Sequence, residues 1–260
     1  MEDDQKKWLY YAIPIAVVVA LGAALYFGKR HKEEAAATEP VVEAPVATVS
    51  EPVEHHPIET PTPAEQLPTL ADSDAPLQQS LSQIFGNALD RYLVPRDIIK
   101  RFVATIDNLP RKKTAVQMWP VKPLGGELAI NGRDEITLND ANYDRYKPIV
   151  RLATSADTER LIAVYKRFYP LFQQAYVDLG YPEGYFNDRL IEVIDHLLET
   201  PEIQGPVKLV QPGVFYEFAD PSLESRSSGQ KLLLRMGNDN AAAVKLKLRD
   251  IRREIAQRPN

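Results

Sequence analysis

The stretch Ser155-Ala-Asp-Thr-Glu-Arg-Leu-Ile-Ala-Val-Tyr-Lys-Arg-Phe-Tyr-Pro-Leu-Phe-Gln-Gln-Ala-Tyr-Val-Asp-Leu-Gly180 repeats large apolar side chains every three or four positions from Leu161 to Leu179. This is the spacing of one face of an α-helix. The stretch therefore predicts a long helix with a wide apolar face. Pro170 lies inside it. Because proline lacks a backbone N–H and crowds the preceding turn, we expect the helix to kink or break there.

Further helices are predicted on both sides of this stretch, from apolar spacing and from start signals such as Ser, Asp, Asn or Pro. The helix near the C-terminus of the chain has two alternative caps, and the helix before it is expected to end at Gly237. The predicted starts are Asp72–Pro76, Pro95, the vicinity of Asn139, the residues after Gly184, Ser227 or Ser228, and Asn238 or Asn240.

A smaller part of the chain reads as extended. Residues 114–138 are expected to form strands, beginning with Ala115–Trp119. Asn131-Gly132 lies between two apolar runs and predicts a β-hairpin, because both residue types tolerate positive φ. Two more short strands are expected at Val207–Val210 and Val214–Phe218. The predicted fold class is mainly α with a small β-sheet (α+β).

The N-terminal part of the chain predicts a membrane anchor. Trp8–Gly28 carries no charge and is 21 residues long, which as a helix spans about 32 Å, roughly the hydrocarbon thickness of a bilayer. Aromatic residues lie at both ends, where amphipathic rings favour the membrane interface. Lys29-Arg-His-Lys32 follows instead of a small-residue cleavage site, so we expect an uncleaved single-pass transmembrane helix.

The segment after the anchor predicts a spacer. Glu33–Ala75 holds seven prolines, ten acidic residues and no Lys or Arg. Prolines interrupt helices and unopposed negative charges repel one another, so we expect a disordered linker in which His55-His56 is solvated. The predicted domains are a tail over residues 1–7, a transmembrane helix over 8–28, an acidic Pro-rich disordered linker over 29–73 and a folded, mainly helical domain over 74–260.

The flanking charges leave the orientation open. Three basic residues follow Trp8–Gly28, whereas Lys6, Lys7 and the α-amino group precede it, which leans slightly toward a cytoplasmic domain. Long domains, however, cross membranes largely regardless of flanking charge, and the chain has no cysteine. We favour a bacterial inner-membrane protein with a periplasmic domain, and the alternative is a domain facing the cytoplasm.

The folded part carries too little charge to indicate nucleic-acid binding. Residues 76–260 have a net charge of +3, because the full chain carries −5, residues 1–32 carry +2 and residues 33–75 carry −10. Arg111-Lys-Lys113 is a short basic run that is expected to be solvated, with contact to anionic lipid or a partner as the alternative. The stretch after Gly229 holds eight Lys or Arg and three Asp or Glu, a basic face that could meet lipid headgroups or the acidic linker.

No catalytic or cofactor motif is present. The chain has no Gly-Xaa-Ser-Xaa-Gly, no phosphate-binding loop and no dinucleotide fingerprint. The strongest polar pattern places Asp188, Glu192, Asp195 and Glu199 on one face of the helix after Gly184, with His196 beside them. Such a face could bind a divalent cation or perform acid–base chemistry. We interpret it as a solvated acidic face, and expect no metal and no cofactor.

The second candidate is aromatic. Eight rings gather within residues 165–186, and those near Arg189 could line a groove for a peptide or a glycan. The alternative is that most of these rings form the core. The candidate groove residues are Tyr176, Tyr181, Tyr185, Asn187 and Arg189.

Several strings resemble one bacterial family of uncharacterised function, the DUF3014 family. They are Pro170–His196, Tyr216–Pro221, Gly229–Gly237, and Asp107–Arg111 together with Trp119–Pro123. The resemblance covers most of residues 74–256. It implies a membrane-anchored bacterial protein, and it brings no known activity, substrate or catalytic residue.

These observations favour a single-pass protein that presents a non-enzymatic binding or scaffold domain to the cell envelope. The expected partners are the membrane, through Trp8–Gly28, and an envelope protein or polymer. The alternative is an envelope hydrolase or metal-dependent enzyme that uses Asp188, Glu192 and Asp195.

Overall fold

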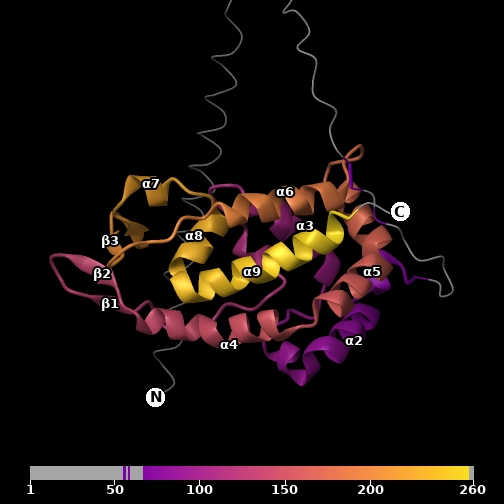
Figure 1. The fold of residues 1–260 in the computed structure, drawn as a ribbon, viewed down its shortest axis with the longest axis horizontal. Helices are drawn as coiled ribbons and strands as arrows, with labels where there is room; N and C mark the ends of the chain where they lie inside the picture. Colours follow the sequence, from indigo (N-terminus) through magenta and orange to yellow (C-terminus); the bar gives the residue numbers. More distant parts are fainter. Residues whose placement is uncertain (1–54, 57, 59–66, 258–260) are drawn as a thin grey trace, which may run out of the picture. The chain divides into compact units, whose positions relative to one another are not determined.

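The computed structural model describes residues 55–56, 58 and 67–257, all of which belong to the second of two compact units, residues 54–260. This part is mainly helical with a small antiparallel sheet, as the sequence predicts (Figure 1). Its elements are η1 (Leu70–Asp72), α2 (Asp74–Phe85), η2 (Gly86–Arg91), α3 (Ile98–Asn108), η3 (Val116–Met118), β1 (Ile130–Asn131), β2 (Ile136–Leu138), α4 (Ala141–Ser155), α5 (Thr158–Asp178), α6 (Phe186–Leu198), β3 (Lys208–Val210), β4 (Glu217–Phe218), α7 (Pro221–Glu224), α8 (Ser228–Arg235) and α9 (Asn238–Ile255).

The long predicted helix is α5, and it continues through Pro170 without a break. The proline removes one backbone hydrogen bond. That loss is offset because α5 buries its apolar face against α2, α3 and α9, with Phe168 fully buried. Tertiary packing therefore overrides the local cost, and the predicted break does not occur.

The start of α3 depends on a residue far away in the sequence. The predicted start at Pro95 is wrong by three residues, because the helix begins at Ile98. Asp97 precedes it in the left-handed region, with φ 53°. The carboxylate of Asp74 accepts hydrogen bonds from the backbone N–H groups of Asp97 (2.7 Å) and Ile98 (2.8 Å). A side chain of α2 thus caps α3.

The start of α9 also differs from the prediction. The cap position is Gly237, and Asn238 is the first helical residue. A Cβ atom at Gly237 would lie 2.8 Å from the Tyr143 ring, and φ is +83°, so this position requires glycine. Asn240 instead donates hydrogen bonds to the backbone oxygens of Tyr143 and Met236. It ties α9 to α4 and to the end of α8.

The four strands pair in the order β1-β2-β3-β4, all antiparallel. The predicted hairpin is confirmed, with Asn131 as the last residue of β1 and Gly132, at φ +78°, as the first residue of the turn. Ala115–Trp119 was expected to be extended, but Val116–Met118 forms a 3₁₀ turn. In Figure 1 the sheet lies at one end of this unit, next to α7.

Helix α9 contacts four other helices, α4, α5, α6 and α8 (Figure 1). Its basic side chains attach it to the ends of other helices. Lys245 Nζ donates to the Thr200 carbonyl oxygen, and Lys247 Nζ donates to Ala156 O at 2.5 Å. Burial lowers the pKa of Lys245. Part of the basic face predicted for this stretch is therefore used inside the domain.

The N-terminal predictions lie outside the described residues. This holds for the transmembrane helix at Trp8–Gly28 and for most of the linker. Within the described ranges, no helix has both the length and the apolar character needed to cross a bilayer.

Candidate functional site

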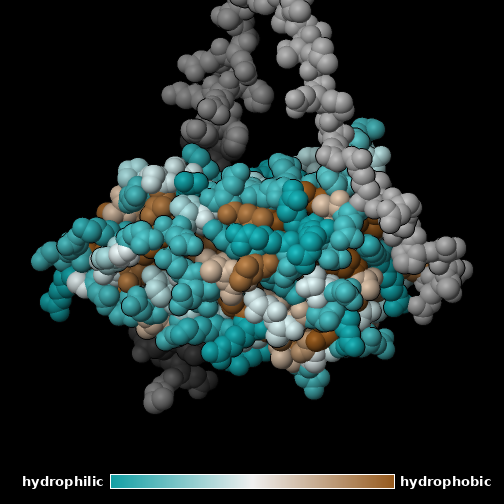
Figure 2. Space-filling model, viewed as in Figure 1, coloured by the Kyte–Doolittle hydropathy of each residue, from teal (hydrophilic) through white to brown (hydrophobic). Residues whose placement is uncertain are grey.

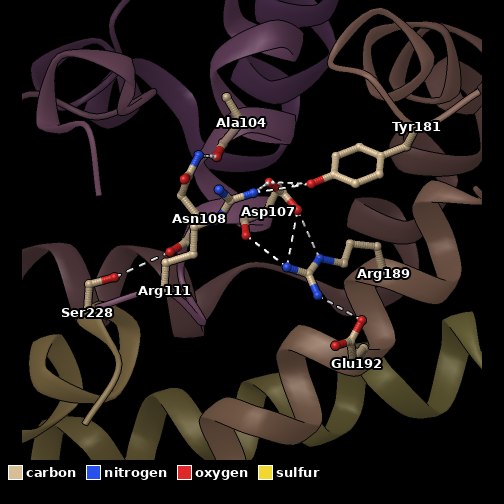
Figure 3. Close-up of polar contacts among 8 residues, drawn as sticks. All are labelled: Ala104, Asp107, Asn108, Arg111, Tyr181, Arg189, Glu192 and Ser228. Atoms are coloured by element: carbon tan, nitrogen blue, oxygen red, sulfur yellow. Dashed lines mark hydrogen bonds and ion pairs between the residues drawn. The ribbon is translucent and has the colours of Figure 1, made fainter. Parts of the chain in front are cut away.

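The most buried charge in the described part of the domain is the carboxylate of Asp107, which is 2% exposed and lies near the end of α3 (Figure 3). It accepts hydrogen bonds from Arg111 Nη2 (2.7 Å), the Tyr181 hydroxyl (3.2 Å) and Arg189 Nε (3.2 Å). Arg189 Nη2 also donates to the backbone oxygen of Asp107 at 2.9 Å. We call Asp107, Arg111, Tyr181, Arg189 and Glu192 the polar cluster.

The polar cluster balances its charges. Arg189 Nη1 donates to Glu192 at 2.8 Å, so two guanidinium groups face two carboxylates. Burial opposes the charged form of Arg189, but the hydrogen bond and charge of Glu192, with the charge of Asp107, raise its pKa above the ordinary value. A paired network with a buried carboxylate at its centre fixes the positions of helices. Here it joins α3 to α6.

The candidate groove residues do not share one exposed surface. The Tyr176 ring is buried and stacks on Tyr181, with ring centroids 4.6 Å apart. Burial raises the pKa of the Tyr176 hydroxyl. Asn187 is fully buried, Arg189 belongs to the polar cluster, and Tyr185 is 50% exposed. Most of the other rings in residues 165–186 form the core.

Asn187 and Asp188 hold His55 and His56, from the predicted linker, against the domain. The Asn187 side-chain amide donates to His56 O (2.8 Å) and to Ile255 O (3.0 Å). Asp188 accepts from the His56 backbone N–H and from His55 Nδ1, both at 2.8 Å. The expectation that His55-His56 is fully solvated is therefore wrong for His56, whose side chain is 19% exposed.

The predicted acidic face is divided among separate partners. Asp188 contacts the linker, Glu192 pairs with Arg189, and Asp195 pairs with Arg252 on α9. Glu199 is exposed. His196 Nε2 lies 2.8 Å from Ser227 Oγ. In the part of the chain that the structure describes, no three His, Asp or Glu side chains are placed to share a metal ion.

A large, partly open apolar cavity lies among the core helices. Its volume is about 390 Å³, and α2, α3, α5, α6, α8 and α9 all contribute to its wall. The Tyr165 hydroxyl is the only side-chain polar group among the lining residues. Tyr165 is buried, which raises the pKa of its hydroxyl well above the ordinary value and keeps it neutral. The lining residues are Leu77, Leu81, Ile98, Phe102, Ile106, Leu109, Leu161, Ile162, Val164, Tyr165, Phe172, Leu190, Val193, Ile194, Leu197, Gly229, Leu232, Leu233, Met236, Val244, Leu248, Ile251 and Ile255.

One face of the described domain is mainly hydrophilic (Figure 2). On the face drawn in Figure 2, apolar residues appear as small patches separated by hydrophilic ones. Chemically, the apolar cavity can take up a hydrocarbon ligand and offers it no hydrogen-bonding group apart from Tyr165.

Comparison with known proteins identifies the family. The model of DUF3014, described as a protein of unknown function, matches residues 98–252. The chain belongs to this family. The match runs from the first residue of α3 into α9, so it includes most of the cavity wall and the whole polar cluster. No curated protein and no solved structure matches the chain.

Proposed function

We propose that this DUF3014 protein is a non-enzymatic binding protein whose helical domain takes up an apolar ligand in the cavity, and that Trp8–Gly28 anchors it in a bacterial inner membrane with the domain in the periplasm. The observation that carries the binding function is the apolar cavity itself. Its volume of about 390 Å³ lies in the range of ligand pockets, roughly 300–1,000 Å³. An engineered cavity of about 150 Å³ is already large enough to bind benzene.

The energetics support a bound ligand. Unfilled apolar space inside a fold costs stability, because the side chains that line it lose packing contacts. The total stability of a domain is about 5–15 kcal/mol. A hydrocarbon ligand would recover much of this cost because it restores the missing contacts. Binding energy and fold stability are thus expected to be linked.

A membrane anchor suits an apolar ligand because the bilayer is a reservoir of hydrocarbon. With the linker held at His56, residues 29–54 remain as the proposed spacer. A flexible chain of that length has a mean reach of about 28 Å. The domain would therefore stay close to the bilayer surface, where it could exchange ligand with the membrane.

Photolabelling tests the proposal with the full-length chain in phosphatidylcholine nanodiscs. The probe is a long-chain alcohol with a diazirine in the middle of the chain and a terminal alkyne. We expect saturable labelling of peptides from α6 and α8, and competition by the unlabelled alcohol. Labelling spread evenly over the surface, without saturation, would contradict the proposal.

A matched pair of variants controls for the specificity of labelling. Val244→Phe places a ring into the cavity from α9, whereas Leu246→Phe adds the same ring at a residue of α9 that is 60% exposed and does not line the cavity. We expect Val244→Phe to lose most of the saturable labelling and Leu246→Phe to keep it. Equal labelling of the two variants would place the probe outside the cavity.

A further inference from the structure

A second hollow, polar and open to the surface, lies where the ends of α3 and α6 meet the start of α8. Its volume is about 480 Å³, and Lys112, His196, Arg226, Ser227 and Gln230 are among its lining residues. No Asp or Glu lines it. We call it the polar hollow. It combines two cations with hydroxyl and amide groups, which is the composition of a site for an anion.

The two cations of the polar hollow have no acidic partner. Neither Lys112 nor Arg226 makes a side-chain ion pair with any residue in the described ranges. Arg189, Lys231 and Arg252, by contrast, each pair with a carboxylate. The charge of the polar hollow is therefore available to a ligand.

The polar hollow and the apolar cavity share a wall. Three pairs of consecutive residues each contribute one member to each space. In each pair named below, the first residue lines the apolar cavity and the second lines the polar hollow. The pairs are Leu109 and Pro110, Leu197 and His196, and Gly229 and Gln230.

Gly229 is a closely packed point of this wall. The Gly229 backbone N–H donates to Leu109 O at 2.9 Å. The position that a Cβ atom would take at Gly229 lies 2.6 Å from Leu197 Cδ2 and 3.1 Å from Leu109 Cβ. Two leucine side chains against a bare glycine therefore separate the two spaces. A ligand that occupied both spaces would have to displace one of these leucine side chains.

We propose that the ligand is a single-chain anionic amphiphile, with its chain in the apolar cavity and its head in the polar hollow at Lys112 and Arg226. This inference rests on the proposed function, because it needs the cavity to hold the chain. The head is a carboxylate or a phosphate monoester, since both present the anionic oxygens that lysine and arginine bind. Ser227 and Gln230 are buried and already bonded to His196, so the head would be held by the two cations.

The test compares ligand heads on one chain. The full-length chain in phosphatidylcholine nanodiscs is photolabelled with three probes of equal chain length, an alcohol, a carboxylic acid and an alkyl phosphate. Labelling of the peptides from α6 and α8 is measured in the K112E/R226E variant and in the K100E/K113E variant. The second variant carries the same change of charge at exposed residues that do not line the polar hollow.

We expect K112E/R226E to weaken labelling by the acid or the phosphate by about tenfold or more relative to K100E/K113E, because reversal of two contacting charges costs more than about 1.4 kcal/mol. Labelling by the alcohol should be equal in the two variants. The carboxylic acid and the alkyl phosphate distinguish the two kinds of head. Higher salt should weaken only the anionic probes.

Each contrary outcome has its own meaning. If the alcohol and both anions label the cavity equally in the two variants, the headgroup inference is wrong and the proposed function stands. If inorganic phosphate alone competes as strongly as the alkyl phosphate, the polar hollow binds a free anion and the inference is also wrong. If no probe labels the cavity, the proposed function itself fails.

Discussion

Arg189 on α6 hydrogen-bonds to both the side chain and the backbone of Asp107 on α3, through Nε at 3.2 Å and Nη2 at 2.9 Å. The two residues are 82 positions apart in the sequence. Asp107 is 2% exposed, and the Arg189 side chain is 18% exposed, so the pair is shielded from water. It sets the position of α6 against α3, and both helices line the apolar cavity.

Asp107→Asn should destabilise the domain by about 3 kcal/mol, because it removes the buried carboxylate that faces Arg189 and leaves that guanidinium paired with Glu192, which is 66% exposed. Arg111→Gln should cost under about 1 kcal/mol, since the Arg111 side chain is 55% exposed. Thermal unfolding followed by circular dichroism at 222 nm measures both changes. Equal costs for the two variants would mean that burial does not govern this network.

Val193→Ile should stabilise the protein by about 1 kcal/mol, because Val193 lines the cavity and the added methylene fills empty apolar space. The matched control is Val103→Ile. Val103 is 1% exposed but does not line the cavity, so the same addition there should overpack the core and destabilise by about 1 kcal/mol. The unfolding temperatures of the two variants are compared with that of the wild type. Destabilisation by Val193→Ile would argue against a cavity at this site.

Affinity should rise with the length of the ligand chain. Each added methylene that enters the cavity contributes about 0.8 kcal/mol, which is about fourfold in Kd. The gain should stop when the chain fills the volume of about 390 Å³. Competition of photolabelling by unlabelled fatty acids of increasing length, used below their micelle concentrations, measures this series. A Kd that does not depend on chain length would rule out burial of the chain.

Glu224 links the sheet to α8, and we expect low pH to weaken this link. This carboxylate accepts from Lys231 Nζ (2.6 Å) and from the Phe218 backbone N–H (2.9 Å). Burial raises its pKa, but these hydrogen bonds and the positive charges of Lys231 and Arg235 outweigh burial and hold the pKa below 4.5.

Because the folded pKa of Glu224 is the lower one, its contribution to stability is full well above pH 4.5 and is lost as the pH falls through the folded value. Glu224→Gln should therefore destabilise the protein at pH 7 more than at pH 3.5. Unfolding temperatures of the wild type and the variant at the two pH values test this. An equal loss at both pH values would show that the charge of Glu224 is not responsible.

The proposed orientation in a membrane can be tested with one introduced thiol. The chain has no cysteine, so Thr60→Cys provides a unique site for a membrane-impermeant maleimide. We expect labelling in intact cells, consistent with a periplasmic domain, and lysed cells serve as the positive control. Labelling that appears only after lysis would place the domain in the cytoplasm.

Most helices could be predicted from the sequence because each buries a regular apolar stripe. The stripe of α3 and that of α6 match the core residues closely. The helix ends were harder to predict, because distant residues determine them. Asp74 caps α3 from another helix, and the Tyr143 ring fixes Gly237 at the start of α9.

The sequence contained a signal from which the burial of Asp107, at the centre of the polar cluster, could have been predicted. Asp107 lies four residues after Val103 and three after Ala104, so it falls on the buried face of α3. An acid at such a position requires a buried partner. The sequence could not identify Arg189 as that partner, since helical spacing says nothing about which helices meet.

The apolar cavity could not be predicted at all. Apolar spacing shows which residues face the interior, and most of the lining residues belong to predicted stripes. It does not show whether the side chains fill the space between helices. That depends on the distances among six helices, which are a property of the tertiary structure.

The amide of Asn187 holds two distant parts of the chain, His56 within the predicted linker and Ile255 at the end of α9. A mechanical pull on the N-terminal tether would therefore reach the domain first at His56, Asn187 and Asp188. The same amide would pass the load to the last turn of α9, the helix whose Val244, Leu248, Ile251 and Ile255 close one side of the cavity. Tension on the proposed tether would thus reach the helix that lines the cavity through the amide of Asn187.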